Sequence, residues 1–362
     1  MTTVDPTFAS CALPRVETER VTLGHGSGGQ LSAELLRDVL LPALGAGSAL
    51  AARAGQPDGG VLEDAAVLDI DGVTLVTSTD AFVVSPLFFP GGDIGTLAVH
   101  GTVNDLAMMG ATPLALTVAY IIEEGFPLDD LRRIIASVGS AAAAAGVPVV
   151  TGDTKVVPRG AADGIFVTTS GIGRRLPAAR VSAAAARPGD AVLVSGPIGA
   201  HGTTVLSARE ALGFEADIAS DTRPLHRLVQ AMVERRGGDI HVMRDPTRGG
   251  VASALNEIAA ASGVGVEIDE TALPVPPLVA AACDLLGLDP LHVANEGCLI
   301  AVVAPEAADE ILAVMRSRPE SRHATCLGDV VAGHPGRVVM RTLLGSTRLV
   351  DMLVGEQLPR IC

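Results

Sequence analysis

Strand-like and helix-like apolar segments alternate along this chain in two long blocks, which are separated by residues 174–188. The separating stretch is rich in Ala, Arg and Pro, a composition typical of a connection between domains. Neither block keeps a strict strand–helix–strand order, and the first contains segments typical of neighbouring hairpin strands. This mixture favours two α+β domains over one doubly wound sheet. A length of 362 residues is also too great for one ordinary core.

In the first block, the spacing of apolar residues predicts four strands and three helices. The predicted strands are 73–84, 114–122, 147–150 and 165–173, and the predicted helices are 31–41, 93–109 and 129–145. Asp93 or Thr96 is the expected N-cap of the second helix, and Gly146 is the expected residue that ends the third. We therefore expect an N-terminal domain over 45–176, preceded by an arm over 1–44 that carries a glycine-rich loop.

The second block predicts a similar mixture. Its predicted strands are 191–195, 240–243, 264–269, 298–304, 323–331 and 337–341, and its predicted helices are 203–212, 222–236, 248–262, 275–286 and 305–317. Residues 346–362 contain Gly355 and Pro359 and show no strong periodicity. We therefore expect a C-terminal domain over 177–345 and a mobile tail over 346–362 that ends in Cys362.

Charge and cysteine usage exclude several classes of function. The chain has 41 acidic and 26 basic residues, so it lacks the basic surface that nucleic-acid binding demands. Its longest apolar runs, such as 114–122, are about half a bilayer span and are typical of buried strands. The five cysteines are scattered without a CxxC pair, and the first residues lack the pattern of an export signal. We expect a cytoplasmic protein that binds neither nucleic acid nor membrane.

Five aspartates lie in apolar contexts, where a solvated surface position is a weak explanation. They are Asp64, Asp80, Asp105, Asp153 and Asp245. A buried carboxylate is costly unless it is paired, capped or bound to a metal ion. Each of them could simply be a turn or cap residue. Together they favour a shared Mg²⁺ site, because Mg²⁺ prefers oxygen ligands and couples carboxylates to substrate phosphates.

The glycine-rich patch over 24–29 precedes a predicted helix, so its backbone N–H groups could surround a phosphate. It is not a Walker A loop, since no Lys-Ser or Lys-Thr follows, and no strand frames it as a dinucleotide-binding fingerprint. A flexible turn is the competing interpretation.

Several motifs carry a specific resemblance when they are taken together and in order. The segments GHGSGGQ (24–30), EDAA (63–66), TDAF (79–82), SPLFFPGG (85–92) and NDLAMMG (104–110) resemble the superfamily of aminoimidazole ribonucleotide synthetase and selenophosphate synthetase. The segments VTGDTKVV (150–157), RDPTRGG (244–250), ANEG (294–297) and PRIC (359–362) resemble, within it, the HypE family of hydrogenase maturation factors.

The resemblance implies a PurM-like fold of two α+β domains, in a homodimer whose N-terminal domains pair into a shared β-barrel beside the nucleotide sites. It also implies a reaction. A carbamoyltransferase, HypF, would load a carbamoyl group onto Cys362, and ATP would drive its dehydration to a thiocyanate. The cyanide would then pass to iron on a HypC–HypD complex and become a ligand of the [NiFe]-hydrogenase centre.

The resemblance also assigns roles to residues. The metal ligands would be Asp64, Asp80, Asp105 and Asp245, and the nucleotide-binding residues would be Gly26, Ser27, Gly28, Gly29, Asn104, Thr151, Gly152 and Asp153. Asp153 is also a weaker candidate for the metal site. Glu296 would be the base that removes protons. Lys155, the only lysine of the chain, would neutralise developing negative charge. Without the resemblance, Glu296 and Lys155 could both be ordinary surface residues.

Cys362 could likewise be an exposed terminal thiol with no role. An extended tail over 346–362 would span about 55–60 Å, however, which is long enough to reach the protein's own active site. Two other functions stay open. One is a related ATP-using enzyme such as selenophosphate synthetase, although residues 24–29 lack the Cys and Lys expected there. The other is a carrier that presents Cys362 without catalysis.

Overall fold

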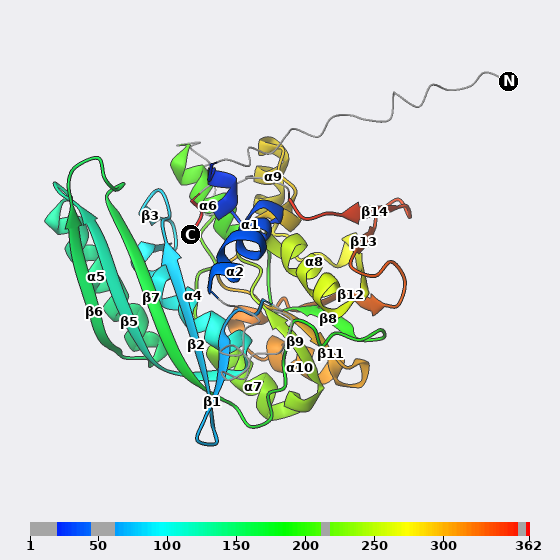
Figure 1. The fold of residues 1–362 in the computed structure, drawn as a ribbon. Helices are drawn as coiled ribbons and strands as arrows, with labels where there is room; N and C mark the ends of the chain where they lie inside the picture. Colours follow the sequence, from blue (N-terminus) through cyan, green and yellow to red (C-terminus); the bar gives the residue numbers. More distant parts are fainter. Residues whose placement is uncertain (1–19, 45–61, 211–217, 354–359) are drawn as a thin grey trace.

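The computed structural model of the chain describes residues 20–44, 62–210, 218–353 and 360–362. These form two large sheets with helices packed on them and one two-stranded hairpin (Figure 1). The N-terminal arm contributes η2 (Leu23–Gly26), α1 (Gln30–Leu35), η3 (Leu36–Leu40) and α2 (Leu41–Leu44). No helix in these described ranges is long and apolar enough to cross a membrane.

The N-terminal sheet has five strands in the order β1-β2-β7-β5-β6. Their bounds are β1 (Ala66–Ile70), β2 (Val73–Phe82), β5 (Ala111–Glu123), β6 (Val149–Val157) and β7 (Ile165–Arg175). Only β5 and β6 pair in parallel. A short hairpin, β3 (Phe88–Phe89) with β4 (Gly92–Asp93), follows β2. The sheet is open over the residues described, so the single chain does not form the β-barrel that the resemblance implies.

Helices α4 (Ile94–Met108) and α5 (Leu128–Ala145) cover one face of this sheet (Figure 1). Asp93 caps α4 as predicted, since its Oδ1 accepts a hydrogen bond of 2.9 Å from the Thr96 backbone N–H. Gly146 ends α5 with a φ of 74°, a left-handed conformation that suits glycine. Nearly all of α4 is buried, because it lies between the N-terminal sheet and the C-terminal unit.

The C-terminal sheet has seven strands in the order β14-β13-β10-β12-β8-β11-β9. The strands are β8 (Ala191–Val194), β9 (Ile240–Arg244), β10 (Gly265–Asp269), β11 (Ile300–Val303), β12 (Thr325–Val331), β13 (Val338–Arg341) and β14 (Thr347–Val350). The helices are α6 (Ala200–Arg209), α7 (His226–Arg236), α8 (Gly250–Ser262), α9 (Pro277–Leu286) and α10 (Ala308–Arg316). Helix α8 packs on one face, and α7 and α10 pack on the other. The central strands β8 and β11 are therefore buried on both faces.

Three local predictions were wrong. Strand β1 was not predicted, although it pairs along its length with β2. Strand β6 continues to Val157, past the predicted end at 150, because residues 151–157 pair with β5. The predicted tail begins too early, since Thr347–Val350 form β14 beside β13. In each case a neighbouring strand supplies hydrogen bonds that local periodicity does not reveal.

Candidate active site

A cavity of about 900 Å³ lies between the N-terminal arm, the ends of β2 and α4, and the start of α8. Most of the predicted catalytic and metal-binding residues line this cavity. Its lining includes Gly28, Gly29, Asp64, Asp80, Asp105, Arg244, Asp245, Arg248, Glu257, Glu296 and Cys362. The four predicted metal ligands, the predicted base and the terminal cysteine therefore share one cavity, although they come from segments far apart in the sequence.

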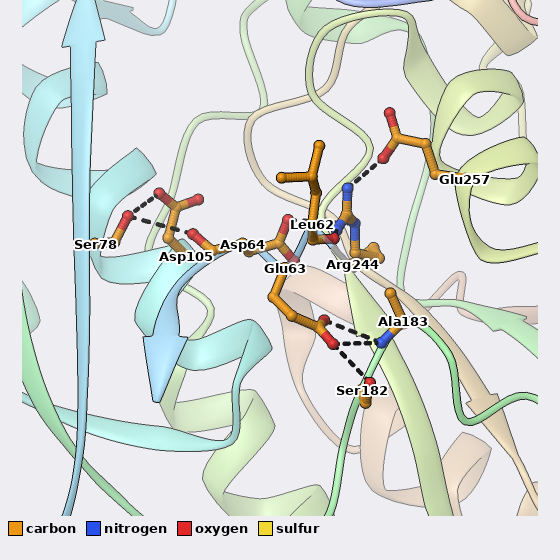
Figure 2. Close-up of polar contacts among 9 residues, drawn as sticks. All are labelled: Leu62, Glu63, Asp64, Ser78, Asp105, Ser182, Ala183, Arg244 and Glu257. Carbon is orange, nitrogen blue, oxygen red and sulfur yellow. Dashed lines mark hydrogen bonds and ion pairs between the residues drawn. The ribbon is translucent and has the colours of Figure 1, made fainter. Parts of the chain in front are cut away.

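The segment that carries Asp64 is anchored by its neighbour (Figure 2). The Glu63 carboxylate accepts hydrogen bonds from the Ser182 hydroxyl at 2.6 Å and from the Ala183 backbone N–H at 3.0 Å. This contact ties the chain before β1 to the start of the C-terminal unit. Asp64 can therefore form an ion pair with Arg244, in which the Asp64 Oδ1 lies 3.2 Å from the Arg244 Nε. Its Oδ2 is buried and has no hydrogen-bond partner in the described part of the chain.

Asp80 and Asp105 come from two elements that pack on each other, β2 and α4. Asp105 Oδ2 accepts a 2.6 Å hydrogen bond from the Ser78 hydroxyl (Figure 2). Asp80 Oδ1 accepts one of 2.7 Å from the Ala81 backbone N–H. Each carboxylate keeps acceptor capacity that these contacts do not use.

Burial disfavours the charged form of all four aspartates, and neighbouring carboxylates add to this effect at Asp64, Asp105 and Asp245. Burial raises the pKa of Asp64 to about 8 and that of Asp245 to about 6. The pKa of Asp105 lies well above its usual range, because of burial and then the charges of Asp245, Asp80 and Asp64. Burial also raises the pKa of Asp80. A bound cation would reverse these shifts, so the residues fit a metal ion. Over the described ranges, no three such groups form a ready-made ligand set.

Arg244 supplies the main positive charge on the Asp64 side of the cavity. Its guanidinium pairs with Glu257 and Asp64, and its Nη1 donates a 3.1 Å hydrogen bond to the Leu62 carbonyl (Figure 2). Neither Arg244 nor Arg248 was predicted as a site residue. The available signal was their position in the RDPTRGG motif, on either side of Asp245.

Glu296 is only 3% exposed, and its Oε1 has no hydrogen-bond partner among the described residues. The turn that carries it is fixed by Asp221, which accepts hydrogen bonds of 3.1 and 3.0 Å from the backbone N–H groups of Glu296 and Gly297. Burial, followed by the charges of Asp245 and Asp221, raises the pKa of Glu296 well above its usual range. A carboxylate in this setting gains affinity for a proton, as a general base requires.

The last three residues, Arg360–Cys362, bring the C-terminus into the cavity. The Cys362 carbonyl accepts a 3.0 Å hydrogen bond from the Val83 backbone N–H. Burial raises the pKa of the Cys362 thiol to about 12, although Arg248 opposes the shift. The thiol is therefore neutral at physiological pH, which suits a side chain that carries a group better than a nucleophile.

Only part of the glycine-rich patch faces the cavity. Gly28 and Gly29 line it with φ of 78° and 81°. A Cβ at Gly29 would lie 2.4 Å from the Leu353 carbonyl oxygen, so a larger residue does not fit. Gly26 and Ser27 lie outside the lining, although the Gly26 carbonyl accepts a 3.0 Å hydrogen bond from Arg248. The patch therefore packs against the RDPTRGG loop.

Asn104 lies outside the cavity lining, contrary to its predicted role. Its side-chain amide donates to the Arg223 carbonyl at 3.1 Å and accepts from the Leu225 backbone N–H at 2.8 Å. It thus joins α4 to the C-terminal unit. Because Asn104 is buried at this interface, its side-chain amide is not accessible to a ligand in the cavity.

The residues predicted around Lys155 are not brought to this cavity either. Thr151, Gly152, Asp153 and Lys155 all lie on the exposed strand β6. Lys155 Nζ lies 2.6 Å from Asp153 Oδ2, and both side chains face solvent. Within one chain, these residues therefore lie outside the cavity that Cys362 lines.

Comparisons with known proteins identify the family of the chain. The chain matches the families described as AIR synthase related protein, N-terminal domain, over residues 62–175, and C-terminal domain, over 187–341. It is 53% identical to the carbamoyl dehydratase HypE of Rhizobium leguminosarum bv. viciae over 96% of both chains. A solved HypE in complex with ATP is 51% identical, with a TM-score of 0.77 over 93% of this chain and 98% of that one. A HypE–HypF complex contains a chain 49% identical, with a TM-score of 0.78 over 81% of this chain and 94% of that one.

Proposed function

This chain belongs to the HypE family of hydrogenase maturation proteins, and from that membership we propose that it uses ATP to dehydrate an S-carboxamide on its own Cys362 to a thiocyanate. One observation carries the proposal: the Cys362 thiol shares a cavity with Glu296 and the four aspartates. A carrier without catalysis would have no need for a buried Glu296 beside its cargo whose Oε1 lacks a hydrogen-bond partner within the described part of the chain.

The reaction has a simple balance. The carboxamide carbon loses its bond to oxygen, its nitrogen loses two protons, and a carbon–nitrogen triple bond forms. Bound ATP would supply the phosphoryl group that turns the amide oxygen into a leaving group, so that this oxygen ends in inorganic phosphate beside ADP. Glu296 would accept an N–H proton, because its burial favours the protonated form.

Asp64, Asp80, Asp105 and Asp245 would hold Mg²⁺, with phosphate oxygens completing the ligand set. Mg²⁺ would supply charge neutralisation for phosphoryl transfer. The support comes from the buried, unpartnered Asp64 Oδ2 and from the raised pKa values of the four carboxylates. Gly28 and Gly29 would border the nucleotide, and Gly29 would offer it a backbone N–H group, since that of Gly28 donates to the Ser32 hydroxyl at 3.0 Å.

We also propose a homodimer in which the two N-terminal sheets join into a β-barrel. Strand β6 is an unpaired edge over the residues described, and three of its valines, Val149, Val150 and Val156, are 41–67% exposed. Such an edge favours pairing with a second sheet. Lys155, Thr151, Gly152 and Asp153 would then act at the cavity of the partner chain, which would explain why they lie away from Cys362 in their own chain.

The partners follow from the same reasoning. A HypF-type carbamoyltransferase would load Cys362, and a HypC–HypD complex would receive the cyanide for the [NiFe]-hydrogenase iron. Both steps require the tail to leave the cavity, which a length of about a dozen residues beyond β14 allows. The cytoplasmic location and the domain limits at 44 and 176 stay predictions.

The direct test is mass spectrometry of the intact protein carbamoylated on Cys362. Addition of Mg-ATP should remove the mass of one water from the protein and release one ADP per chain. The same incubation with a non-hydrolysable ATP analogue is the control and should leave the mass unchanged. ADP release without loss of water from the protein would reject the self-substrate reaction.

A further inference from the structure

The C-terminal tripeptide is held by contacts that lie outside the carboxylate cluster. We use the name tail seat for His201 and Arg209 on α6, Asp163 before β7, and residues 83–85 after β2. Helix α6 belongs to the C-terminal unit and the other parts belong to the N-terminal unit. The tripeptide therefore lies between the two units and contacts both of them.

His201 is fully buried, and its Nε2 lies 2.8 Å from the Ile361 carbonyl oxygen. Its Nδ1 lies 2.7 Å from the Ser220 hydroxyl. A carbonyl oxygen can only accept, so Nε2 carries the proton and donates to Ile361. Nδ1 then accepts from Ser220 in the neutral ring. The ring also meets Phe89 edge to face, with 5.5 Å between the centroids. The contacts with Ser220 and Phe89 thus fix the orientation of the His201 ring and of its Nε2–H donor.

Arg209 joins the tail to the strand end beside it. Its Nε donates a 2.8 Å hydrogen bond to the Ser85 carbonyl, and its Nη2 donates one of 2.9 Å to the Arg360 carbonyl. The Ser85 backbone N–H donates to the same Arg360 carbonyl at 3.1 Å. The planar guanidinium can reach both carbonyl groups at once, which an ammonium group cannot do with the same geometry.

Two side chains of the tail are also recognised. Arg360 pairs with Asp163 and donates a 2.8 Å hydrogen bond from Nε to the Val83 carbonyl. Ile361 is 3% exposed and belongs to the apolar core shared by the two units. The main-chain bonds of His201 and Arg209 set the register, and these side chains exclude a shift by one residue. Such a shift would place Ile361 in the cavity instead of Cys362.

We propose that His201 and Arg209 are positioning residues, which recognise a C-terminal peptide of basic, aliphatic and cysteine residues and direct its thiol into the cavity. This inference rests on the proposed function only for the identity of the group that the thiol carries. The seat itself is defined by contacts of the unmodified chain. Its disruption should free Cys362 without altering the carboxylates.

The experiment measures the alkylation rate of each cysteine in the intact, full-length protein with iodoacetamide, by peptide mass spectrometry and without ATP. His201→Phe keeps the ring but removes the donor, and Arg209→Ala removes both hydrogen bonds. Each should make Cys362 react at least about tenfold faster. A lost hydrogen bond to a buried carbonyl shifts the equilibrium from the seated toward the released tail by about that factor or more. Cys283 and Cys298, both fully buried, report loosening of the fold and should stay unreactive. Arg132→Ala removes an exposed arginine and should leave every rate unchanged.

His201→Gln provides the rescue, because its amide N–H can replace the Nε2 donor. It should return the alkylation rate of Cys362 toward that of the parent protein. Equal Cys362 rates in the parent, His201→Phe and Arg209→Ala proteins would overturn the proposal. A His201→Gln protein as reactive as His201→Phe would also overturn it, as would parallel exposure of Cys298. Because the readout needs neither carbamoylation nor ATP, a protected Cys362 in a protein that fails to dehydrate would reject the proposed function alone.

Discussion

At the scale of single residues, the site is defined by acidic groups that are buried or partly buried in one cavity. Glu296 Oε1 and Asp64 Oδ2 are buried without partners among the residues described. An unsatisfied buried carboxylate costs free energy, so its retention needs a compensating use. Arg244 offsets part of the charge at Asp64, whereas Glu296 has no such ion pair in the described structure. This difference matches a metal-binding role for one and proton transfer for the other.

Replacement of Glu296 by Gln should separate binding from chemistry. Glutamine keeps the size and a polar end but cannot accept the proton, and general-base catalysis contributes about 10²–10⁴-fold. The expected result is normal carbamoylation of Cys362 and normal ATP binding, with a loss of dehydration of that order by intact mass. Dehydration at the parental rate would remove Glu296 as the base.

Asp105→Asn should stabilise the ligand-free protein while weakening its response to Mg-ATP. The substitution removes a carboxyl whose charged form is disfavoured by burial and by Asp245, Asp80 and Asp64. We expect an unfolding free energy higher by about 1 kcal/mol without ligand, and a smaller rise in melting temperature on addition of Mg-ATP. Asp69→Asn, on an exposed part of β1, is the matched control. An undiminished Mg-ATP shift in Asp105→Asn would argue against this carboxylate as a ligand.

At the scale of elements, strand β6 combines a polar motif with an unpaired edge. Its residues up to Val156 are exposed, in contrast to the alternating burial of β5 and β7. A strand of this kind at the edge of a sheet is a site for association with another chain. A role for Lys155 at the active site would therefore require β6 to meet a second molecule.

A charge on this strand should weaken the proposed dimer. Val150→Glu replaces a side chain that is 61% exposed in the single chain, so the monomer fold should tolerate it. In a dimer the new carboxylate would be desolvated. This should lower the association constant several-fold to about tenfold or more. Sedimentation velocity should show a shift toward monomer, with an unchanged circular dichroism spectrum. Leu285→Glu, on α9 and 72% exposed, should keep the parental association state. Equal association of all three proteins would argue against β6 as the interface.

At the scale of the whole molecule, α4 connects the two units. Leu97 and Val103 belong to the core under the N-terminal sheet, whereas Ala107 and Met108 belong to the core of the C-terminal unit. Polar contacts reinforce this connection: His100 Nδ1 lies 3.1 Å from the Thr222 hydroxyl, in the loop that leads to α7. The cavity depends on this packing, because its carboxylates come from both units.

The same interface should make the fold sensitive to acid. Burial, and then the charge of His226, lowers the pKa of His100 to about 4 from an ordinary value of 6.5. The folded state therefore binds fewer protons than the unfolded state between these values. The contribution of neutral His100 to the stability of the fold is complete above pH 6.5. It is lost as the pH falls toward 4, at about 1.4 kcal/mol per unit of pKa shift. Urea unfolding across this range should show a shallower pH dependence for His100→Gln than for the parent. Identical slopes would mean that His100 does not contribute.

The types of element and the candidate chemistry could be predicted because both depend on local patterns. Periodicity located α4, α5 and α8, and the caps at Asp93 and Gly146 follow from the backbone needs of a helix end. The same patterns could not locate β1, β14 or the second half of β6. A strand is stabilised by its neighbours, and those neighbours are distant in sequence.

The amino-acid pattern alone establishes two α+β units, a surplus of aspartates in apolar settings and the cysteine at position 362. The folded chain adds that Asp64, Asp105, Asp245 and Cys362 share one cavity, that Arg244 pairs with Asp64, and that Lys155 does not join them within one chain. The two kinds of information differ in the distance along the chain over which they act. Apolar periodicity acts over a few residues, whereas convergence depends on the packing of α4 between two units and on a tail seated between them.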